Sequence, residues 1–278
     1  MAAPSRPPTW LIYPGAVATL LLAAFAIRPH TDAPAPPPPL PSGEGAVLNE
    51  AAPFDALSVQ RVHRSFGGDQ VTAFAIGDGG VWLAPAGLAQ GCAHPTLVVG
   101  GGQGVAATAR PAGAGAELAV FTTRGGAPAL PLAADPPRPD ALAYAAGFPH
   151  GRPAEVAMRL LGPEALPVHD GARPSLTVLA WAVIGRTDSL GGDDLTGLAG
   201  APVLDASGRV VGVVIGEQPR RGRVYSATLA EIAAALRIAG ARPATAATGQ
   251  AITRANYGMA ADDLRRTYRV VSAICATG

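Results

Sequence analysis

Short apolar segments broken by turn-forming residues fill the chain from about Phe54 to Tyr225. Gly, Pro, Asp and Asn separate these segments, as expected when many short strands are joined by turns. No ten-residue segment with helical periodicity occurs in this range. The pattern therefore predicts an all-β fold, either a sandwich or a barrel. Nine strands are expected, at residues 71–76, 81–85, 96–100, 117–121, 141–148, 156–162, 176–183, 201–205 and 209–216.

The periodicity becomes helical at Thr228. Thr228 and Glu231 have the spacing of a capping box, and the apolar positions that follow run to Gly240, a residue typical of a helix end. A second helix is expected from Ala260 to Cys275, because apolar residues recur there at helical spacing. These residues are Leu264, Tyr268, Val271 and Cys275. The strands are therefore expected to be followed by C-terminal helices.

The segment from Trp10 to Ile27 is an uncharged apolar run of 18 residues. As a helix it would reach roughly 27 Å, enough to cross the hydrocarbon core of a bilayer. Arg6 precedes the run, while Arg28 and Asp32 nearly cancel beyond it, so the positive-inside rule places the amino terminus in the cytoplasm. We therefore expect a transmembrane anchor that precedes an exported domain. A cleaved signal peptide is the alternative, because Ala24-Phe25-Ala26 has the form of a cleavage site.

A proline-rich stretch, residues 29–45, follows the apolar run. Proline at this density forms stiff polyproline II and packs no core, so we interpret the stretch as a spacer. The expected organisation has four parts. They are a cytoplasmic tip and anchor at 1–28, a linker at 29–53, a β domain at 54–240 and a C-terminal loop and helix at 241–278.

Charge and cysteine content narrow the function classes. The net charge is +1 and only 15% of the residues are charged, which argues against nucleic acid as a partner. The two cysteines, Cys92 and Cys275, are a disulfide candidate in an exported protein, with two free buried thiols as the alternative. The two cysteines and the histidines do not have the spacing of a metal site. We expect no metal and no cofactor.

Several motifs occur in an order that resembles the bacterial trypsin-like serine proteases of the cell envelope. Residues 72–88 resemble the strand–turn–strand that ends in Thr-Ala-Ala-His, and residues 116–121 resemble an Asp-Leu-Ala-Leu-Leu strand. Residues 146–162 are similar to the opening of the second barrel, and residues 194–212 to the nucleophile loop. Residues 224–236 close the match. The resemblance implies a double β-barrel with a C-terminal helix, in the periplasm and attached to the inner membrane.

The resemblance places the catalytic triad on residues that lack the required chemistry. The histidine position falls on Ala86, the aspartate position on Glu117 and the serine position on Ala199. A methyl group neither accepts the proton nor attacks a carbonyl, so two of the three catalytic roles are absent. The backbone of Gly197, Leu198 and Ala199 is still expected to form a nest of amide donors like an oxyanion hole.

Displaced residues are weak substitutes for a triad. The histidines fall in expected loops, and the hydroxyl residues near the nucleophile loop have no base beside them in the sequence. The residues in question are His63, His94, His150, His169, Ser189, Thr196 and Ser207. We interpret them as solvated loop residues.

Three hypotheses on function follow. The first is a membrane-anchored pseudoprotease that binds a protein or peptide in the envelope, with the strand near Ile215-Gly216-Glu217 as an edge for an extended peptide. The second is an active serine-type endopeptidase with non-standard catalytic residues. The third is an accessory subunit of a larger membrane complex. A purely structural role for the retained loop is the alternative to peptide binding.

Overall fold

A computed structural model describes residues 54, 59–61, 70–110, 113, 115–167, 175–187, 195, 197–218, 221–244 and 249–276. These residues belong to one compact unit, Asn49–Gly278. The apolar run 10–27 and the proline-rich stretch lie outside the described residues. Within the described part of the chain, no helix is both long and apolar enough to span a bilayer.

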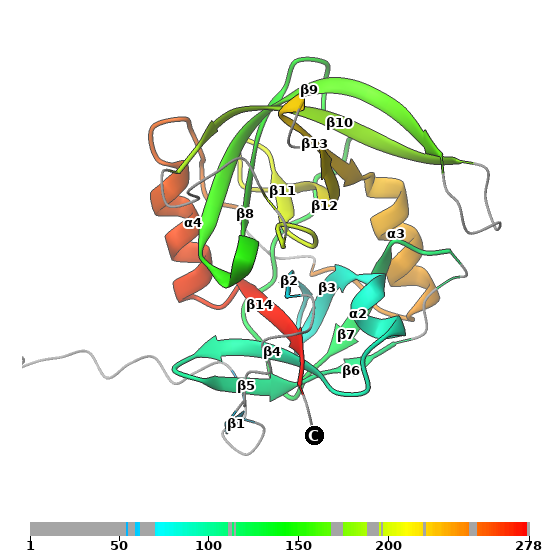
Figure 1. Cartoon of the computed structure of the whole chain (residues 1–278), viewed down its shortest axis with the longest axis vertical. Helices are drawn as coiled ribbons and strands as arrows, with labels where there is room; N and C mark the ends of the chain where they lie inside the picture. Colours follow the sequence, from blue (N-terminus) through cyan, green and yellow to red (C-terminus); the bar gives the residue numbers. More distant parts are fainter. Residues whose placement is uncertain are drawn as a thin grey trace, which may run out of the picture. The chain divides into compact units, whose positions relative to one another are not determined.

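The first half of the domain forms a barrel-like sheet of eight strands, drawn in the lower half of Figure 1. Their spatial order is β1-β5-β4-β14-β2-β3-β7-β6. The strands are β1 (Val59–Arg61), β2 (Val71–Gly77), β3 (Val81–Pro85), β4 (Pro95–Gly100), β5 (Gln103–Ala106), β6 (Thr108–Ala109), β7 (Leu118–Thr122) and β14 (Val270–Cys275). A five-residue helix, α2 (Ala86–Gln90), follows β3 directly.

The second half forms a closed barrel with the order β10-β13-β12-β11-β8-β9. Its strands are β8 (Leu142–Gly147), β9 (Ala154–Pro167), β10 (Ser175–Arg186), β11 (Pro202–Leu204), β12 (Val210–Gln218) and β13 (Arg223–Ala227). A short 3₁₀ turn, η3 (Pro149–Gly151), joins β8 to β9. Each of the nine segments expected to be strands contains a strand. The apolar residues of these segments lie in the cores of the two sheets.

One fully buried tryptophan lies in each sheet. The indole N–H of Trp82 donates to Thr123 Oγ1 at 2.9 Å, and that of Trp181 donates to Ser226 Oγ at 2.8 Å. Each ring therefore fills the core without leaving its polar atom unsatisfied.

Two helices flank the sheets on opposite sides in Figure 1. Helix α3 (Leu229–Ile238) contacts β7 and β12, and helix α4 (Tyr257–Arg266) contacts β8, β9 and β14. The N-cap prediction for α3 is confirmed, because the Thr228 side chain accepts a hydrogen bond from the Glu231 amide at 3.3 Å.

The expected helix over 260–275 is wrong in its second half. Helix α4 ends at Arg266, and Tyr268 takes a left-handed φ of 57° that turns the chain. Strand β14 then inserts between β2 and β4, with Ala273 opposite both Val71 and Leu97. A run rich in β-branched residues fits a strand, and the apolar spacing that suggested a helix also fits one buried on both faces. The C-terminal segment thus completes the first sheet.

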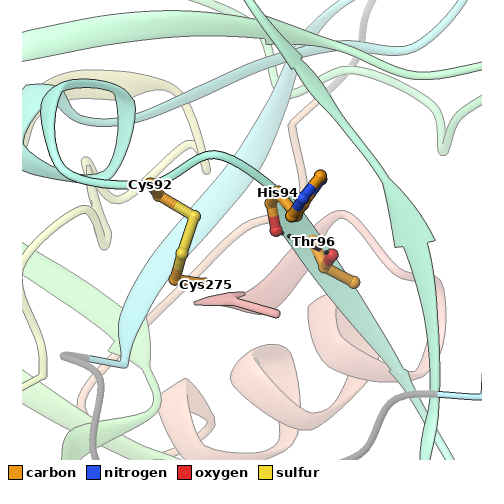
Figure 2. Close-up of a disulfide and its surroundings, with 4 residues drawn as sticks. All are labelled: Cys92, His94, Thr96 and Cys275. Carbon is orange, nitrogen blue, oxygen red and sulfur yellow. Dashed lines mark hydrogen bonds between the residues drawn. A yellow bond between two sulfur atoms is a disulfide. The ribbon is translucent and has the colours of Figure 1, made fainter. Parts of the chain in front are cut away.

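A disulfide between Cys92 and Cys275 ties the end of β14 to the loop that follows α2 (Figure 2). The two Cα atoms are 5.4 Å apart although 183 positions separate them in sequence. The carbonyl of His94 accepts hydrogen bonds from the Thr96 hydroxyl at 3.1 Å and from the Ala276 amide at 3.0 Å. Covalent and backbone links together attach the C-terminus to β4.

Candidate functional site

Ala86 and Glu117 are adjacent because β3 and β7 are antiparallel neighbours, with Pro85 opposite Leu118. The Ala86 amide donates to the Glu117 carbonyl at 2.9 Å. The Ala86 methyl group is only 2% exposed and packs in the apolar core of the first sheet. The backbone at position 86 thus lies beside Glu117, and its methyl group faces the apolar core of the first sheet.

The loop that contains Ala199 reaches the same place from the second barrel. The Thr72 amide, in β2, donates to the Ala199 carbonyl at 2.9 Å. A Cβ on Gly200 would lie 2.6 Å from Pro85 Cδ and 1.9 Å from the Thr72 carbonyl oxygen, so only glycine fits there. Segments around positions 86, 117 and 199 therefore meet at one place between the two sheets.

The loop is a tight turn with left-handed φ values of 95° at Gly197 and 89° at Gly200. The Leu198 amide donates to the Leu195 carbonyl at 2.8 Å, and the Leu198 side chain is buried in the core of the second barrel. Leu198 was expected to offer its amide to a ligand, and this is wrong because that amide closes the turn. The amides of Gly197 and Ala199 have no acceptor within the described residues.

These two amides make the loop a candidate anion or carbonyl site. Two N–H donors at one turn can hold a peptide carbonyl or a carboxylate. The methyl group of Ala199 is partly exposed beside them. The arrangement can bind an oxygen atom but carries no group at position 199 that attacks carbon.

Strand β12 runs beside this loop. Strand β12 pairs with β11 only as far as Val213. The next residue, Val214, accepts a hydrogen bond from the Gly200 amide and donates one to the Ala201 carbonyl of the loop. Beyond that point, Gly216 to Gln218 pair with β13. The edge expected near Ile215-Gly216-Glu217 lies in this part of β12, and it stays a prediction that an extended peptide adds there as a further strand.

Thr72 is a site residue that sequence reasoning missed. Its side chain is fully buried, donates to the Gly197 carbonyl at 3.2 Å and accepts from the Phe148 amide at 3.1 Å. Because both roles of the hydroxyl are used and no imidazole is bonded to it, we regard Thr72 as a brace for the loop. A polar residue among the apolar ones of β2 was the only signal of it in the sequence.

The segment that follows β8 contacts the loop at Gly197. A Cβ on Gly197 would lie 3.1 Å from the Phe148 carbonyl oxygen, 3.2 Å from the Gln70 carbonyl oxygen and 3.2 Å from the His150 amide nitrogen. Gln70 also donates through its side chain to the Ser272 hydroxyl in β14. Backbone atoms of Phe148, Gln70 and His150 therefore lie close to the α carbon of Gly197.

The displaced candidates lie in different places. His150 is exposed in η3 beside Gly197, and His94 is exposed next to the disulfide. Ser207 is exposed in the turn between β11 and β12, where its amide donates to Asp205 Oδ1 at 2.8 Å. The remaining candidates, His63, His169, Ser189 and Thr196, lie outside the described residues.

Glu117 lines a cavity of about 190 Å³ between α3 and the segment before β7. The walls are Gly113, Ala116, Glu117, Leu118, Ala230, Glu231, Ala234, Ala235 and Ile238. No group of three His, Cys, Asp or Glu residues suited to a metal occurs in the described ranges.

Comparison with known proteins places the fold. No family model and no curated protein matches the chain. A solved structure of Rv3671c from M. tuberculosis H37Rv, a serine-to-alanine mutant in its inactive form, is 24% identical, covers 69% of this chain and 89% of that chain, and has a TM-score of 0.53. The active form of the Rv3671c protease is 19% identical, covers 66% of this chain and 86% of that chain, and has a TM-score of 0.51. The chain therefore has the fold of trypsin-like serine protease domains.

Proposed function

We propose that this chain is a membrane-anchored trypsin-fold protein that does not cleave peptides and instead binds an extended peptide or protein segment in the cell envelope. The observation that carries the proposal is the loop at Gly197–Ala199. Its two amides have no acceptor among the described residues, and the side chain at position 199 is a partly exposed methyl group.

The loss of reactivity follows from the residues at the site. Positions 86 and 199, to which the resemblance assigns the base and the nucleophile, carry methyl groups that supply neither role. Removing such groups lowers the rate by several orders of magnitude, while binding by the amide donors is retained.

Binding is supported by the neighbouring edge of β12. A peptide that pairs with β12 at Gly216 would lie near the loop, because Val214 is hydrogen-bonded to Gly200 and Ala201, and the two amides would then hold one of its carbonyl or carboxylate oxygens. Main-chain hydrogen bonds supply affinity in such a mode, and pockets for side chains supply specificity.

A direct test uses the full-length chain, purified in mild detergent, in a selection against phage-displayed random peptides. Affinities of the selected peptides are then measured by fluorescence anisotropy. Ala199→Val fills the space next to the two amides and is expected to weaken binding at least about tenfold. Ala206→Val, in the exposed turn after β11, is the matched control and is expected to bind as the parent does.

Two results would count against the proposal. If no peptide is selected, or if Ala199→Val binds as tightly as the parent, the loop serves only to hold the second barrel together. If the parent chain cleaves casein and reacts with a fluorophosphonate probe, and mutation of a single Ser or Thr abolishes the reaction, the alternative of an active endopeptidase with non-standard residues is correct.

Membrane anchorage and assembly are further parts of the proposal. We infer from residues 10–27 that the protein stays in the membrane with its domain in the periplasm. Alkaline carbonate extraction of membranes should leave the protein in the pellet, and its release would indicate a cleaved signal peptide. Pull-down of the tagged full-length protein tests whether it is an accessory subunit of a larger membrane complex.

A further inference from the structure

Arg265 of α4 lies in a buried contact with the segment that joins β8 to β9. Its guanidinium donates to Glu155 Oε2 at 2.7 Å, to the Ala154 carbonyl at 2.5 Å and to the Gly147 carbonyl at 3.4 Å. The guanidinium carbon also lies 5.7 Å from the centroid of the Phe148 ring. One side chain of α4 thus holds both ends of the segment from Gly147 to Glu155.

This segment is the one that touches the amide loop. The Phe148 amide donates to the Thr72 hydroxyl, which in turn donates to the Gly197 carbonyl. The Phe148 carbonyl and the His150 amide lie against the α carbon of Gly197, where no Cβ would fit comfortably. A continuous series of contacts therefore runs from Arg265 through Phe148 and Thr72 to the carbonyl of Gly197, in the loop that carries the two amides.

We propose that Arg265 is a positioning residue for the peptide site, which it holds in shape through the segment Gly147–Glu155. This inference rests on the proposed function, because it names a residue that keeps the amides of Gly197 and Ala199 in a binding geometry. Arg265 lies outside the loop and acts through its neighbours.

The chemistry of this contact depends on arginine. All three contacts with the segment come from Nη2, while Nη1 donates to Asp262 Oδ1 on α4 itself at 3.0 Å. The planar guanidinium therefore joins the segment to the helix through two nitrogens, whereas an ammonium group has only one. The Nε atom of Arg265 is buried and has no hydrogen-bond partner within the described part of the chain. An incompletely satisfied buried ion pair is an inefficient way to stabilise a fold. A role in fixing the geometry of the segment accounts for its presence better than stability alone.

The test is amide hydrogen exchange, read by mass spectrometry, on the full-length chain and on Arg265→Lys. We expect exchange in the peptide covering 197–201 to rise about tenfold or more, as a lost hydrogen bond to a charged group allows. Exchange in β4 and β5 of the first sheet is expected to stay the same. Arg266→Lys is the matched control, because Arg266 is the next residue on α4, is 75% exposed and, among the described residues, pairs with the Asp263 carboxylate alone.

Peptide affinity provides the second readout. Arg265→Lys is expected to weaken a selected peptide at least about fivefold, and Arg266→Lys is expected to leave it unchanged. The positioning role is overturned if Arg265→Lys leaves exchange at 197–201 at the parent level, or if exchange rises equally in β4 and β5, which would indicate a loss of stability alone. If the parent binds no peptide but exchange at 197–201 still rises selectively, the proposed function fails while the structural coupling stands.

Discussion

Replacing Glu155 with alanine is the sharpest test of how the C-terminal helix is joined to the second barrel. The Glu155 and Arg265 side chains are 8% and 9% exposed, and their charged atoms are 2.7 Å apart. Glu155→Ala leaves a buried guanidinium without its buried partner. Loss of one partner from a buried pair costs about 3–5 kcal/mol. Because Arg265 keeps the Ala154 carbonyl and the exposed carboxylate of Asp262, we expect the low end, about 3 kcal/mol.

The assay is urea unfolding of the full-length chain followed by tryptophan fluorescence, since Trp82 and Trp181 are fully buried and report on one sheet each. Glu164→Ala is the matched control. Its pair with Arg223 is 3.4 Å long and the two side chains are 38% and 33% exposed, so its removal should cost at most about 1 kcal/mol.

A double variant separates charge from packing. Glu155→Leu combined with Arg265→Met replaces the pair by apolar side chains of similar size, and it should recover most of the stability that Glu155→Ala loses. If Glu155→Ala destabilises the chain no more than Glu164→Ala does, the buried pair does not attach α4 to the barrel, and the reasoning is refuted.

Three other outcomes follow from the described contacts. Non-reducing peptide mapping should recover one cross-linked peptide pair containing Cys92 and Cys275, and Cys275→Ser should lower the free energy of unfolding by up to about 5 kcal/mol, because the bond closes a loop of 183 residues; two alkylatable thiols in the protein purified without reductant would contradict this. Burial raises the pKa of the Tyr144 hydroxyl, an effect partly offset by the charge of Arg254. The ionised form is therefore disfavoured in the folded chain, so stability should fall as pH rises past about 10, and Tyr144→Phe should flatten that fall in urea titrations at pH 9 to 11; an identical pH dependence in the two proteins would rule out this cause. Ala199→Ser should stay unlabelled by a fluorophosphonate probe, because position 86 is an alanine and supplies no base. Covalent labelling of the new serine would show that a base is within its reach.

The positions of the strands were predictable from the sequence because the apolar residues of each strand are the ones buried in a core. Segments such as 81–85 and 176–183 are apolar, bounded by turn residues, and lie in the cores as expected. The same local reasoning failed at 260–275, where α4 stops at Arg266 and β14 begins at Val270. Apolar residues spaced three or four apart in a short run fit either a helix or a strand that is buried on both faces. The strand forms here because residues 270–275 hydrogen-bond to β2 on one side and to β4 on the other.

The candidate site was likewise predicted from the sequence only in part. The sequence alone indicated that position 199 supplies no nucleophile, because a methyl group cannot attack a carbonyl in any conformation. It also indicated the loop, since Gly197 and Gly200 mark left-handed backbone that other residues avoid. It did not indicate that the Leu198 amide closes the turn, that the Ala86 methyl group is buried in the first sheet, or that Thr72 braces the loop.

What the sequence determined by itself was the set of strands, the α3 cap and the presence of methyl groups at positions 86 and 199. These are properties of single residues and of local periodicity. The tertiary structure alone decided that residues 270–275 join the first sheet and that Arg265 holds the segment beside Gly197. Those outcomes depend on contacts between residues more than a hundred positions apart, whose energies are set only when the two sheets and the C-terminal segment pack together.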